Sequence, residues 1–216
     1  MRAIVYKRCG GPEVLKVEDV DEPTFKSHEV LIRVEATAVN GRDLFFQQAI
    51  YDPIPGQKKY LGFECSGRIW AKGRSATRWK EGDQVCAFLN GGGYAEIVAV
   101  PADHVMTVPP TCNLLHAAAL PRAAAIVWLS FFHMNHLAPQ SKVLVHGAAG
   151  GVGSLAIRIA KAKNCTVFAT AGSREKAKFC ENLGADFGID HTTDDFSNIV
   201  ADKTNGTGVD YVLDHS

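Results

Sequence analysis

The sequence lacks an excess of either charge, since 23 Lys and Arg residues balance 23 Asp and Glu residues in a chain of 216. Proteins that bind nucleic acid or an anionic membrane usually carry a basic patch or tail, because phosphate groups attract Lys and Arg. The neutral balance therefore argues against both kinds of partner.

Paired cysteines are missing as well. The six cysteines are scattered along the chain, and no two of them form a Cys-x-x-Cys pair. This pattern is typical of reduced thiols that are buried as small apolar side chains, and it argues against a disulfide framework or a cysteine metal site. We therefore predict a cytoplasmic protein.

Long apolar runs are also absent. The longest one, residues 117–132, is interrupted by Pro121 and Arg122, so we expect a buried helix there rather than a membrane span. The apolar stretch near the start, residues 3–6, is too short for a secretion signal. The sequence therefore predicts no membrane association.

What the chain does have is a glycine-dense segment between an apolar run and an amphipathic stretch. Residues 143–145 have strand composition, and the spacing Gly147-x-x-Gly150-x-x-Gly153 follows them. Glycine lets backbone amides approach a pyrophosphate in a tight turn, and a helix N-terminus behind the turn adds partial positive charge. We predict a nucleotide-binding loop here, and the alternative is a plain strand-to-helix turn. The candidate binding residues are Ala149, Gly150, Gly151, Val152 and Gly153.

Two different rhythms divide the chain. Up to about residue 110 the segments are short, strand-like and separated by turn residues, which predicts a small β-barrel or sandwich. Farther along, strands and helices alternate, which predicts a βαβ series with a parallel sheet. The expected strands are residues 143–145, 166–169, 187–189 and 209–213, with helices up to residue 163 and over residues 173–183.

The predicted parallel sheet is short. A doubly wound dinucleotide-binding sheet normally has about six strands, whereas the pattern here supplies about four. Either the sheet is smaller than usual or the chain is a fragment of a longer protein. We favour the fragment, because an apolar strand is an unusual place for a chain to end.

Several short motifs, each weak by itself, occur in a characteristic order. They are Gly10-Gly11-Pro12-Glu13-Val14-Leu15, Asn40-x-x-Asp43, Gly62-Phe63-Glu64-x-x-Gly67, Lys80-x-Gly82-Asp83, Gly93-Tyr94-Ala95-Glu96, Ala117-Ala118-Ala119-Leu120-Pro121 and the glycine loop. With these motifs the chain resembles the medium-chain dehydrogenase/reductase superfamily. Within it, the chain is similar to the zinc-independent quinone oxidoreductases of the zeta-crystallin-like branch.

The resemblance implies an α/β protein with two domains. Residues 1–122 correspond to a GroES-like β-barrel domain that carries substrate and catalytic residues. Residues 123–216 correspond to a Rossmann NADPH-binding domain with an incomplete doubly wound parallel sheet. Full-length relatives are about half as long again and usually form homodimers through the missing part of the sheet, so the resemblance implies a C-terminally truncated chain.

The residues at the zinc positions differ from those of zinc-bearing relatives. A catalytic zinc site needs Cys, His and carboxylate ligands, and those relatives place Cys where Asn40 stands and His where Phe63 stands. The cysteines of the structural zinc lobe are missing too. We therefore expect no metal, with hydrogen bonds polarising the substrate carbonyl or quinone instead.

Cofactor preference depends on the end of the strand at residues 166–169. An acidic residue there would hold a ribose diol and repel a 2′-phosphate, but Gly172 and Ser173 follow the strand and two cations come next. We therefore predict NADPH rather than NADH, with either Lys176 or Arg174 neutralising the phosphate. By resemblance, Lys176 lies at the phosphate-binding lysine, and His191 lies where a tyrosine often contacts the adenosine phosphate. The alternative for both cations is an ordinary solvated helix face.

The candidate catalytic residues are Asn40, Asp43 and Tyr51. By resemblance, Asn40 and Tyr51 face the nicotinamide in the substrate cleft, and the Tyr51 phenol steadies the substrate oxygen as hydride arrives. The alternative is purely structural: Asn40 caps a helix with Asp43 in its first turn, and Tyr51 simply packs.

The resulting functional prediction is an NADPH-dependent, zinc-independent oxidoreductase that transfers hydride to a quinone or an α,β-unsaturated carbonyl. Two alternatives stay open. One is an enoyl or alkenal reductase of the same superfamily, because small pocket residues decide the acceptor. The other is a non-catalytic NADPH-binding or structural protein, as in the crystallin relatives.

Overall fold

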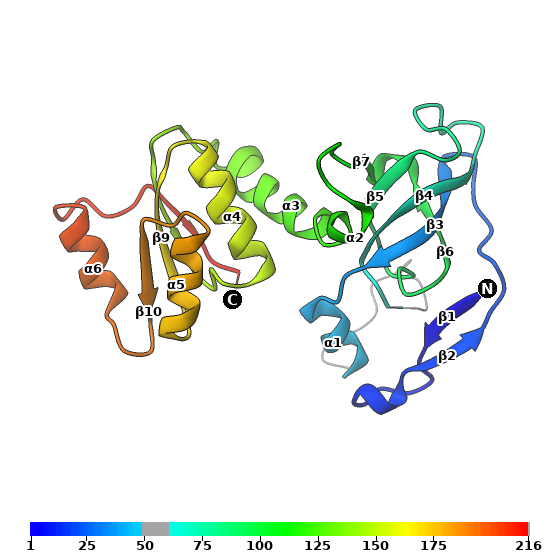
Figure 1. The fold of residues 1–216 in the computed structure, drawn as a ribbon, viewed down its shortest axis with the longest axis horizontal. Helices are drawn as coiled ribbons and strands as arrows, with labels where there is room; N and C mark the ends of the chain where they lie inside the picture. The colour runs from blue at the N-terminus through cyan, green and yellow to red at the C-terminus, as the bar shows by residue number, and fades with distance from the viewer. Residues whose placement is uncertain (49–60, 216) are drawn as a thin grey trace. The chain divides into compact units, whose positions relative to one another are not determined.

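The computed structural model describes residues 1–48 and 61–215 of the chain. The chain divides into two compact units, an N-terminal unit of residues 1–122 and a C-terminal unit of residues 123–216 (Figure 1). Helix α3 (Pro121–Trp128) begins in the first unit and continues into the second. Each unit has its own hydrophobic core, so we describe them separately.

An antiparallel sheet forms the centre of the N-terminal unit. Its five strands lie in the order β6-β3-β4-β5-β7, and β1 pairs with β2 in a separate two-stranded sheet. The strands are β1 (Arg2–Val5), β2 (Lys16–Asp19), β3 (Glu29–Thr37), β4 (Glu64–Lys72), β5 (Gln84–Phe88), β6 (Ile97–Pro101) and β7 (Val105–Thr107). The helical segments are η1 (Pro12–Val14), α1 (Gly41–Gln47), η2 (Ala102–His104) and α2 (Leu114–Ala117).

The long central strands β3 and β4 organise this sheet. Val30 and Ile32 on β3 pack with Cys65 and Ile69 on β4 in one buried cluster, as alternate positions of paired strands do. At Gly67 a Cβ would lie 2.0 Å from the carbonyl oxygen of Arg33, so only glycine fits this close approach. The strands β4 and β7 were not among the segments predicted from the sequence, because buried polar residues in β4 mask its apolar alternation.

A four-stranded parallel sheet forms the centre of the C-terminal unit, in the order β10-β9-β8-β11. The strands are β8 (Lys142–Val145), β9 (Thr166–Ala171), β10 (Phe187–Asp190) and β11 (Tyr211–Leu213). The helices are α4 (Gly151–Ala162), α5 (Arg174–Asn182) and α6 (Phe196–Lys203), preceded by the π-helical segment η3 (Leu129–Met134). The predicted α/β class, with a barrel-type unit followed by a short doubly wound sheet, is confirmed.

Helices cover both faces of the parallel sheet. Val143 and Val145 of β8 belong to the cluster that contains residues of α4 and α5. Leu144, between them, points to the other face and packs in a cluster with Val200 of α6. Helix α6 was not predicted from the sequence. It carries the chain from β10 back past β8 to β11, so the direction of strand order reverses at β8.

The segment 117–132 differs from the single buried helix predicted for it. Helix α2 ends at Ala117, and α3 begins at Pro121, where proline needs no amide hydrogen. Although Val127 is buried, Trp128 is 64% exposed, so one side of the segment faces solvent. In the described residues no helix is long and apolar enough to cross a membrane.

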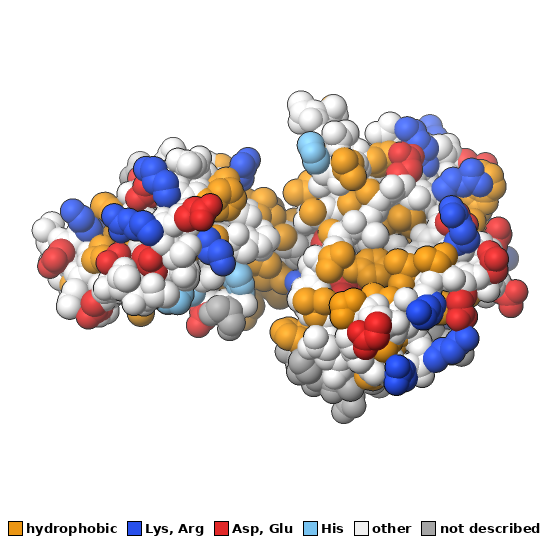
Figure 2. Space-filling model, turned by 60° about the horizontal axis from the view of Figure 1, so that its bottom comes forward, with side chains coloured by type: hydrophobic (Ala, Val, Ile, Leu, Met, Phe, Trp, Pro, Cys, Tyr) orange, Lys and Arg blue, Asp and Glu red, His pale blue; other side chains and the backbone are white. Residues whose placement is uncertain are grey.

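Charged side chains of both signs are interspersed on the surface. On the face that Figure 2 shows, Lys and Arg side chains alternate with Asp and Glu rather than gathering into a field of one sign. This agrees with the formal net charge of zero. This face therefore has no basic patch of the kind that binds a polyanion.

Candidate functional site

The turn after β8 is built from glycines with different roles. Gly147 has a φ of 57°, in the left-handed region that favours glycine. A Cβ on Gly153 would lie 2.5 Å from Ala148 Cα and 2.7 Å from the carbonyl oxygens of Gly147 and Ala148. A Cβ on Gly151 would meet nothing within 4 Å. The turn is therefore packed backbone to backbone at Gly153 and open at Gly151.

Helix α4 begins at this opening without a side-chain cap. Its N-cap residue is Gly150, which makes no side-chain hydrogen bond, and the first amides of an α-helix have no acceptor within the helix. These amides and the helix dipole attract an anion. The helix start also lies at the sheet's switch point, where open α/β sheets bind ligands. The predicted residues 149–153 are therefore brought together in a cradle that fits a phosphate.

An unpartnered histidine lies beside the cradle. His215 follows β11, and its Cε1 would be 4.0 Å from a Cβ on Gly150. Its Nε2 is buried and has no hydrogen-bond partner among the described residues. A buried polar atom without a partner is costly unless a ligand or water satisfies it. Sequence reasoning missed His215, although its position directly after a parallel strand was a usable signal.

The segments after β9 and β10 also meet at this edge of the sheet. Ser173 caps α5, and its Oγ accepts a hydrogen bond from the Lys176 amide at 3.2 Å. His191 follows β10, and its Nε2 would lie 3.7 Å from a Cβ on Gly172. The structure therefore brings Gly172, Ser173 and His191 together, with Lys176 in the adjoining first turn of α5.

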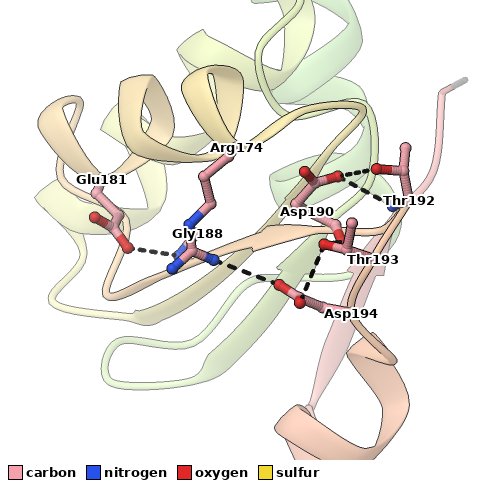
Figure 3. A network of polar contacts seen from close by, with 7 residues as sticks. All are labelled: Arg174, Glu181, Gly188, Asp190, Thr192, Thr193 and Asp194. Atoms are coloured by element: carbon pink, nitrogen blue, oxygen red, sulfur yellow. Dashed lines mark hydrogen bonds and ion pairs between the residues drawn. The ribbon is translucent and has the colours of Figure 1, made fainter.

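The two cations in this turn are not equivalent. Arg174 Nη1 is 3.5 Å from Asp194 Oδ2, and Figure 3 shows the Arg174 side chain directed from the start of α5 toward Asp194. No ion pair involves Lys176 among the described residues. Of the two candidates for a bound phosphate, Lys176 is therefore the one with an uncommitted charge.

In the N-terminal unit, Asn40 belongs to a buried polar network. Its Nδ2 donates to Glu64 Oε1 at 2.8 Å, and its Oδ1 accepts from Arg122 Nη1 at 3.4 Å. The other oxygen of Glu64, Oε2, accepts from the Arg122 amide at 2.9 Å, at the start of α3. Glu64 is only 2% exposed. This carboxylate therefore fixes both the orientation of the Asn40 side-chain amide and the N-terminus of α3.

Sequence reasoning named Glu64 in a motif but gave it no role. The usable signal was its position between Phe63 and Cys65, both of which are fully buried. A carboxylate in an apolar strand needs hydrogen-bond donors from elsewhere in the chain. Here they come from Asn40 and Arg122, which lie 24 and 58 residues away.

Asp43 has a structural role that accounts for its burial. Its Oδ2 accepts a hydrogen bond from the Asn40 backbone amide at 2.9 Å, and its Oδ1 accepts one from the Gly62 backbone amide at 2.8 Å. The carboxylate is 2% exposed and thereby ties the start of α1 to the segment before β4. This matches the capping alternative for Asp43, because both oxygens accept hydrogen bonds from the backbone of the same unit.

Two further side chains lie around Asn40 and Asp43. The Arg42 guanidinium stacks over the rings of Phe63 and Phe46, with its Cζ 4.5 and 5.3 Å from their centroids. Burial, together with the charge of Arg122, lowers the pKa of Arg42. Burial, followed by the charge of the nearby Asp43 and a side-chain hydrogen bond with it, raises the pKa of Tyr94. The network thus presents guanidinium donors beside Asn40.

The predicted substrate contact of Tyr51 and the predicted absence of a metal ion also concern this site. Tyr51 lies outside the described residues, so its proposed contact with a substrate stays a prediction. In the described part of the chain, no group of three or more His, Cys, Asp and Glu side chains is arranged to hold a metal ion.

A segment of each unit matches a known protein family. Residues 26–110 match the family described as alcohol dehydrogenase GroES-like domain, and residues 151–216 match the family described as zinc-binding dehydrogenase. A solved structure of an NAD-dependent alcohol dehydrogenase has a TM-score of 0.90 and 31% identity, and the alignment covers 100% of this chain and 71% of that one. The chain belongs to the medium-chain dehydrogenase/reductase superfamily.

Among members of the superfamily, the synaptic vesicle membrane protein VAT-1 homolog of Danio rerio is 37% identical over 215 residues, which are 99% of this chain and 44% of that protein. The quinone oxidoreductase of Mus musculus is 36% identical over 97% of this chain and 65% of its own length. The chain thus spans about half to two thirds of these curated relatives. The predicted family resemblance is confirmed.

Two further superfamily structures bear on cofactor and substrate. The CurK enoyl reductase has a TM-score of 0.89 with 30% identity, and the alignment covers 100% of this chain and 67% of that one. The Escherichia coli quinone oxidoreductase, solved in complex with NADPH, has a TM-score of 0.88 with 26% identity, covering 99% of this chain and 66% of that one.

Proposed function

We propose that the protein is an NADPH-dependent oxidoreductase that reduces quinones or α,β-unsaturated carbonyl compounds without a metal ion. The observation that carries the proposal is the uncapped helix start at Gly150 with open space at Gly151, next to a turn in which Lys176 has no ion-pair partner among the described residues. The quinone oxidoreductase relatives and the NADPH complex of one of them support it.

In this proposal the C-terminal unit holds the cofactor through two groups of residues. The amides of residues 150–153 bind the pyrophosphate at the start of α4. The bound cofactor also gives the buried Nε2 of His215 the hydrogen-bond partner that it lacks among the described residues. Ser173, Lys176 and His191 surround the adenosine ribose and bind its 2′-phosphate through hydrogen bonds and charge. When bound, NADPH supplies the hydride.

The N-terminal unit, in the same proposal, orients the substrate and stabilises negative charge on its oxygen. Zinc-bearing relatives have metal ligands at residues 40 and 63, whereas Asn40 here has an amide and Phe63 an aromatic ring. The Arg42 guanidinium over Phe63 supplies hydrogen-bond donors at this place. The Asn40 side chain donates to Glu64 Oε1 and to the Ala38 carbonyl, so it lines the site in a fixed orientation. Tyr51 adds a phenol donor. We assign Asp43 to the support of this site rather than to the chemistry, because both its oxygens bind amides.

The first test is a fluorescence titration of the protein with NADPH and NADH, followed by NADPH oxidation assays with 1,4-benzoquinone, 9,10-phenanthrenequinone and simple enones. We expect saturable NADPH binding and turnover with at least one acceptor. Binding without turnover of any acceptor would leave a non-catalytic binding protein as the function. Absence of NADPH binding would overturn the proposal.

The second test addresses the 2′-phosphate. Lys176→Ala should weaken NADPH binding about tenfold or more and leave NADH binding nearly unchanged, because a charge-assisted contact to phosphate is lost. Lys178→Ala is the matched control, since Lys178 lies on the same helix but is paired with Glu181 at 2.8 Å. Equal losses for NADPH and NADH in Lys176→Ala would remove Lys176 from the phosphate site.

An enoyl reductase is the second candidate, favoured by the similarity to the CurK enoyl reductase. The two candidates differ in acceptor, since an enoyl reductase acts on a thioester-conjugated double bond. Comparison of kcat/KM for crotonyl thioesters with that for quinones distinguishes them. A preference of tenfold or more, about 1.4 kcal/mol in transition-state stabilisation, would assign the acceptor class.

A further inference from the structure

The ion pair between Arg174 and Asp194 stands where the proposed function requires positive charge. Arg174 is the first residue of α5, directly after the Ser173 cap, and it precedes Lys176 by two residues. Its guanidinium Nη1 lies 3.5 Å from Asp194 Oδ2. A cation in this place would ordinarily be available to a phosphate at the helix N-terminus. Here its nearest charge partner is a carboxylate of the protein itself.

Asp194 is held in place by the segment that follows β10. Its Oδ1 accepts a hydrogen bond from Thr193 Oγ1 at 3.2 Å, and its own amide donates to the Asp190 carbonyl at 2.8 Å. The Asp194 side chain is 30% exposed, whereas that of Arg174 is 81% exposed. Figure 3 shows Asp194 next to Thr193, with its other oxygen turned toward Arg174. The carboxylate is therefore the partner held by further hydrogen bonds, and the arginine is the more exposed partner.

A second carboxylate makes this segment still more acidic. Asp190 accepts hydrogen bonds from the Thr192 hydroxyl at 2.7 Å and the Thr192 amide at 3.0 Å. These bonds, hydroxyl first, lower the pKa of Asp190, and the charges of His191 and Arg174 act in the same direction. Asp190 thus stays ionised near neutral pH. Arg174 is surrounded by negative charge, while Lys176 has no such partner among the described residues.

The acidic segment adjoins the place proposed for the adenosine ribose. Residues 190–194 begin at the last residue of β10, and Gly172 with Ser173 follows β9, its parallel neighbour. His191, inside the acidic segment, lies against Gly172. Any phosphate bound by Ser173 and Lys176 therefore competes with Asp194 for the guanidinium of Arg174.

We propose that Asp194 is a specificity-determining residue that withholds Arg174 from a ribose 2′-phosphate and so limits the preference for NADPH over NADH. This role rests on the proposed function, because it presumes a 2′-phosphate at Ser173 and Lys176. Asp194 acts through Arg174 and does not itself contact the phosphate. Freeing the arginine adds a second cation to the phosphate site without any change in the cradle at residues 150–153.

The size of the effect follows from the exposure of the pair. Exposed ion pairs contribute roughly 0.2–1 kcal/mol, and 1.4 kcal/mol corresponds to a tenfold change in affinity. Removal of the Asp194 charge should therefore raise the preference for a 2′-phosphate about 1.4- to fivefold. The gain should shrink at high salt, because exposed charges are screened.

The test uses ligands that reach only the adenosine end of the site. Adenosine 2′,5′-bisphosphate and adenosine 5′-monophosphate differ by the 2′-phosphate alone, so the ratio of their dissociation constants from calorimetry measures its contribution. The variants are Asp194→Asn, Arg174→Gln and the double variant. Asp202→Asn is the control, because it removes the same charge from an exposed position on α6. Circular dichroism checks that each variant is folded.

We expect Asp194→Asn to raise the ratio about 1.4- to fivefold, Asp202→Asn to leave it unchanged, and the Asp194→Asn effect to disappear in the Arg174→Gln background. An unchanged ratio in Asp194→Asn would overturn the inference, and so would a gain that persists without Arg174. In both cases wild-type preference for the bisphosphate would leave the proposed function standing. Equal wild-type affinity for the two ligands would instead overturn the NADPH preference on which the inference rests.

Discussion

Two single alanine substitutions in the turn after β8 should have opposite effects on stability. Gly153→Ala puts a Cβ 2.5 Å from Ala148 Cα and 2.7 Å from two carbonyl oxygens, all of them backbone atoms that cannot rotate away. Gly151→Ala puts a Cβ into open space. Both residues belong to α4, so both substitutions gain the same intrinsic helix propensity.

The magnitudes follow from these distances. To reach an ordinary contact of about 3.4 Å, α4 must move nearly 1 Å from the turn in Gly153→Ala, and such overpacking typically costs about 1–3 kcal/mol. Helix propensity returns up to about 1 kcal/mol. We expect a net loss of about 1–2 kcal/mol in the free energy of unfolding, or about 2–8 °C in Tm for a chain of this size. Gly151→Ala should gain up to about 1 kcal/mol.

Cofactor binding should rank the same variants differently. Gly151→Ala keeps the fold but fills the space through which a pyrophosphate approaches the amides of α4, so NADPH affinity should fall about tenfold or more. Urea denaturation followed by circular dichroism measures stability, and fluorescence titration measures binding. If Gly153→Ala proved as stable as Gly151→Ala, the close backbone packing that we describe for Gly153 would be refuted.

Three further predictions concern the N-terminal unit. Glu64→Gln leaves only one acceptor oxygen for the donors of Asn40 and Arg122, so we expect the free energy of unfolding, measured by urea denaturation, to fall by about 1–3 kcal/mol. Because Glu64 is a positioning residue, the same substitution should lower kcat for quinone reduction more than it raises KM. An unchanged kcat would contradict that role. Asp43→Asn likewise loses one of two contacts to backbone amides, so denaturation should show about 1–3 kcal/mol of destabilisation. The kcat per folded molecule should be retained, and a large loss of kcat would indicate that Asp43 takes part in the chemistry. Burial raises the pKa of Cys86 to about 11, so unfolding between pH 9 and that value releases a proton and stability falls as the pH rises. The fall should be shallower in Cys86→Ala, and identical slopes would show that this thiol does not contribute.

The features that sequence predicted well are local ones. The strand, glycine turn and helix around Gly147 and Gly153 follow from residues within about one turn of each other, and so does the start of α5 next to Ser173. The network at Glu64 could not be derived this way, because its partners are 24 and 58 residues distant. Helix α6 has Phe196, Ile199 and Val200 at helical spacing and was missed because it is only 8 residues long. Its N-cap Asp195, which accepts from the amides of Ser197 and Asn198, was the local signal that could have revealed it.

The division of Arg174 and Lys176 into a paired and an unpaired cation was equally out of reach. The sequence shows two similar charges on one helix, and Asp194 lies twenty residues farther along, after another strand. Only the parallel pairing of β9 with β10 brings the carboxylate to the arginine. Local pattern thus gives the residue types of a site, and tertiary pairing decides which of them are free to act.

The backbone packing at Gly153 also bears on how cofactor preference can change. The turn that we propose as a phosphate site is fixed at Gly153 by contacts between main-chain atoms, which leave no room for a side chain at that position. Residues 174 and 194, by contrast, meet through side chains on separate surface segments, where substitutions usually alter stability by less than about 0.5 kcal/mol. In the proposed function, affinity for the dinucleotide and discrimination between its two forms would therefore depend on physically separate parts of the unit. Laboratory evolution toward a different cofactor would be expected to accumulate changes at the surface segments and leave the glycine turn untouched.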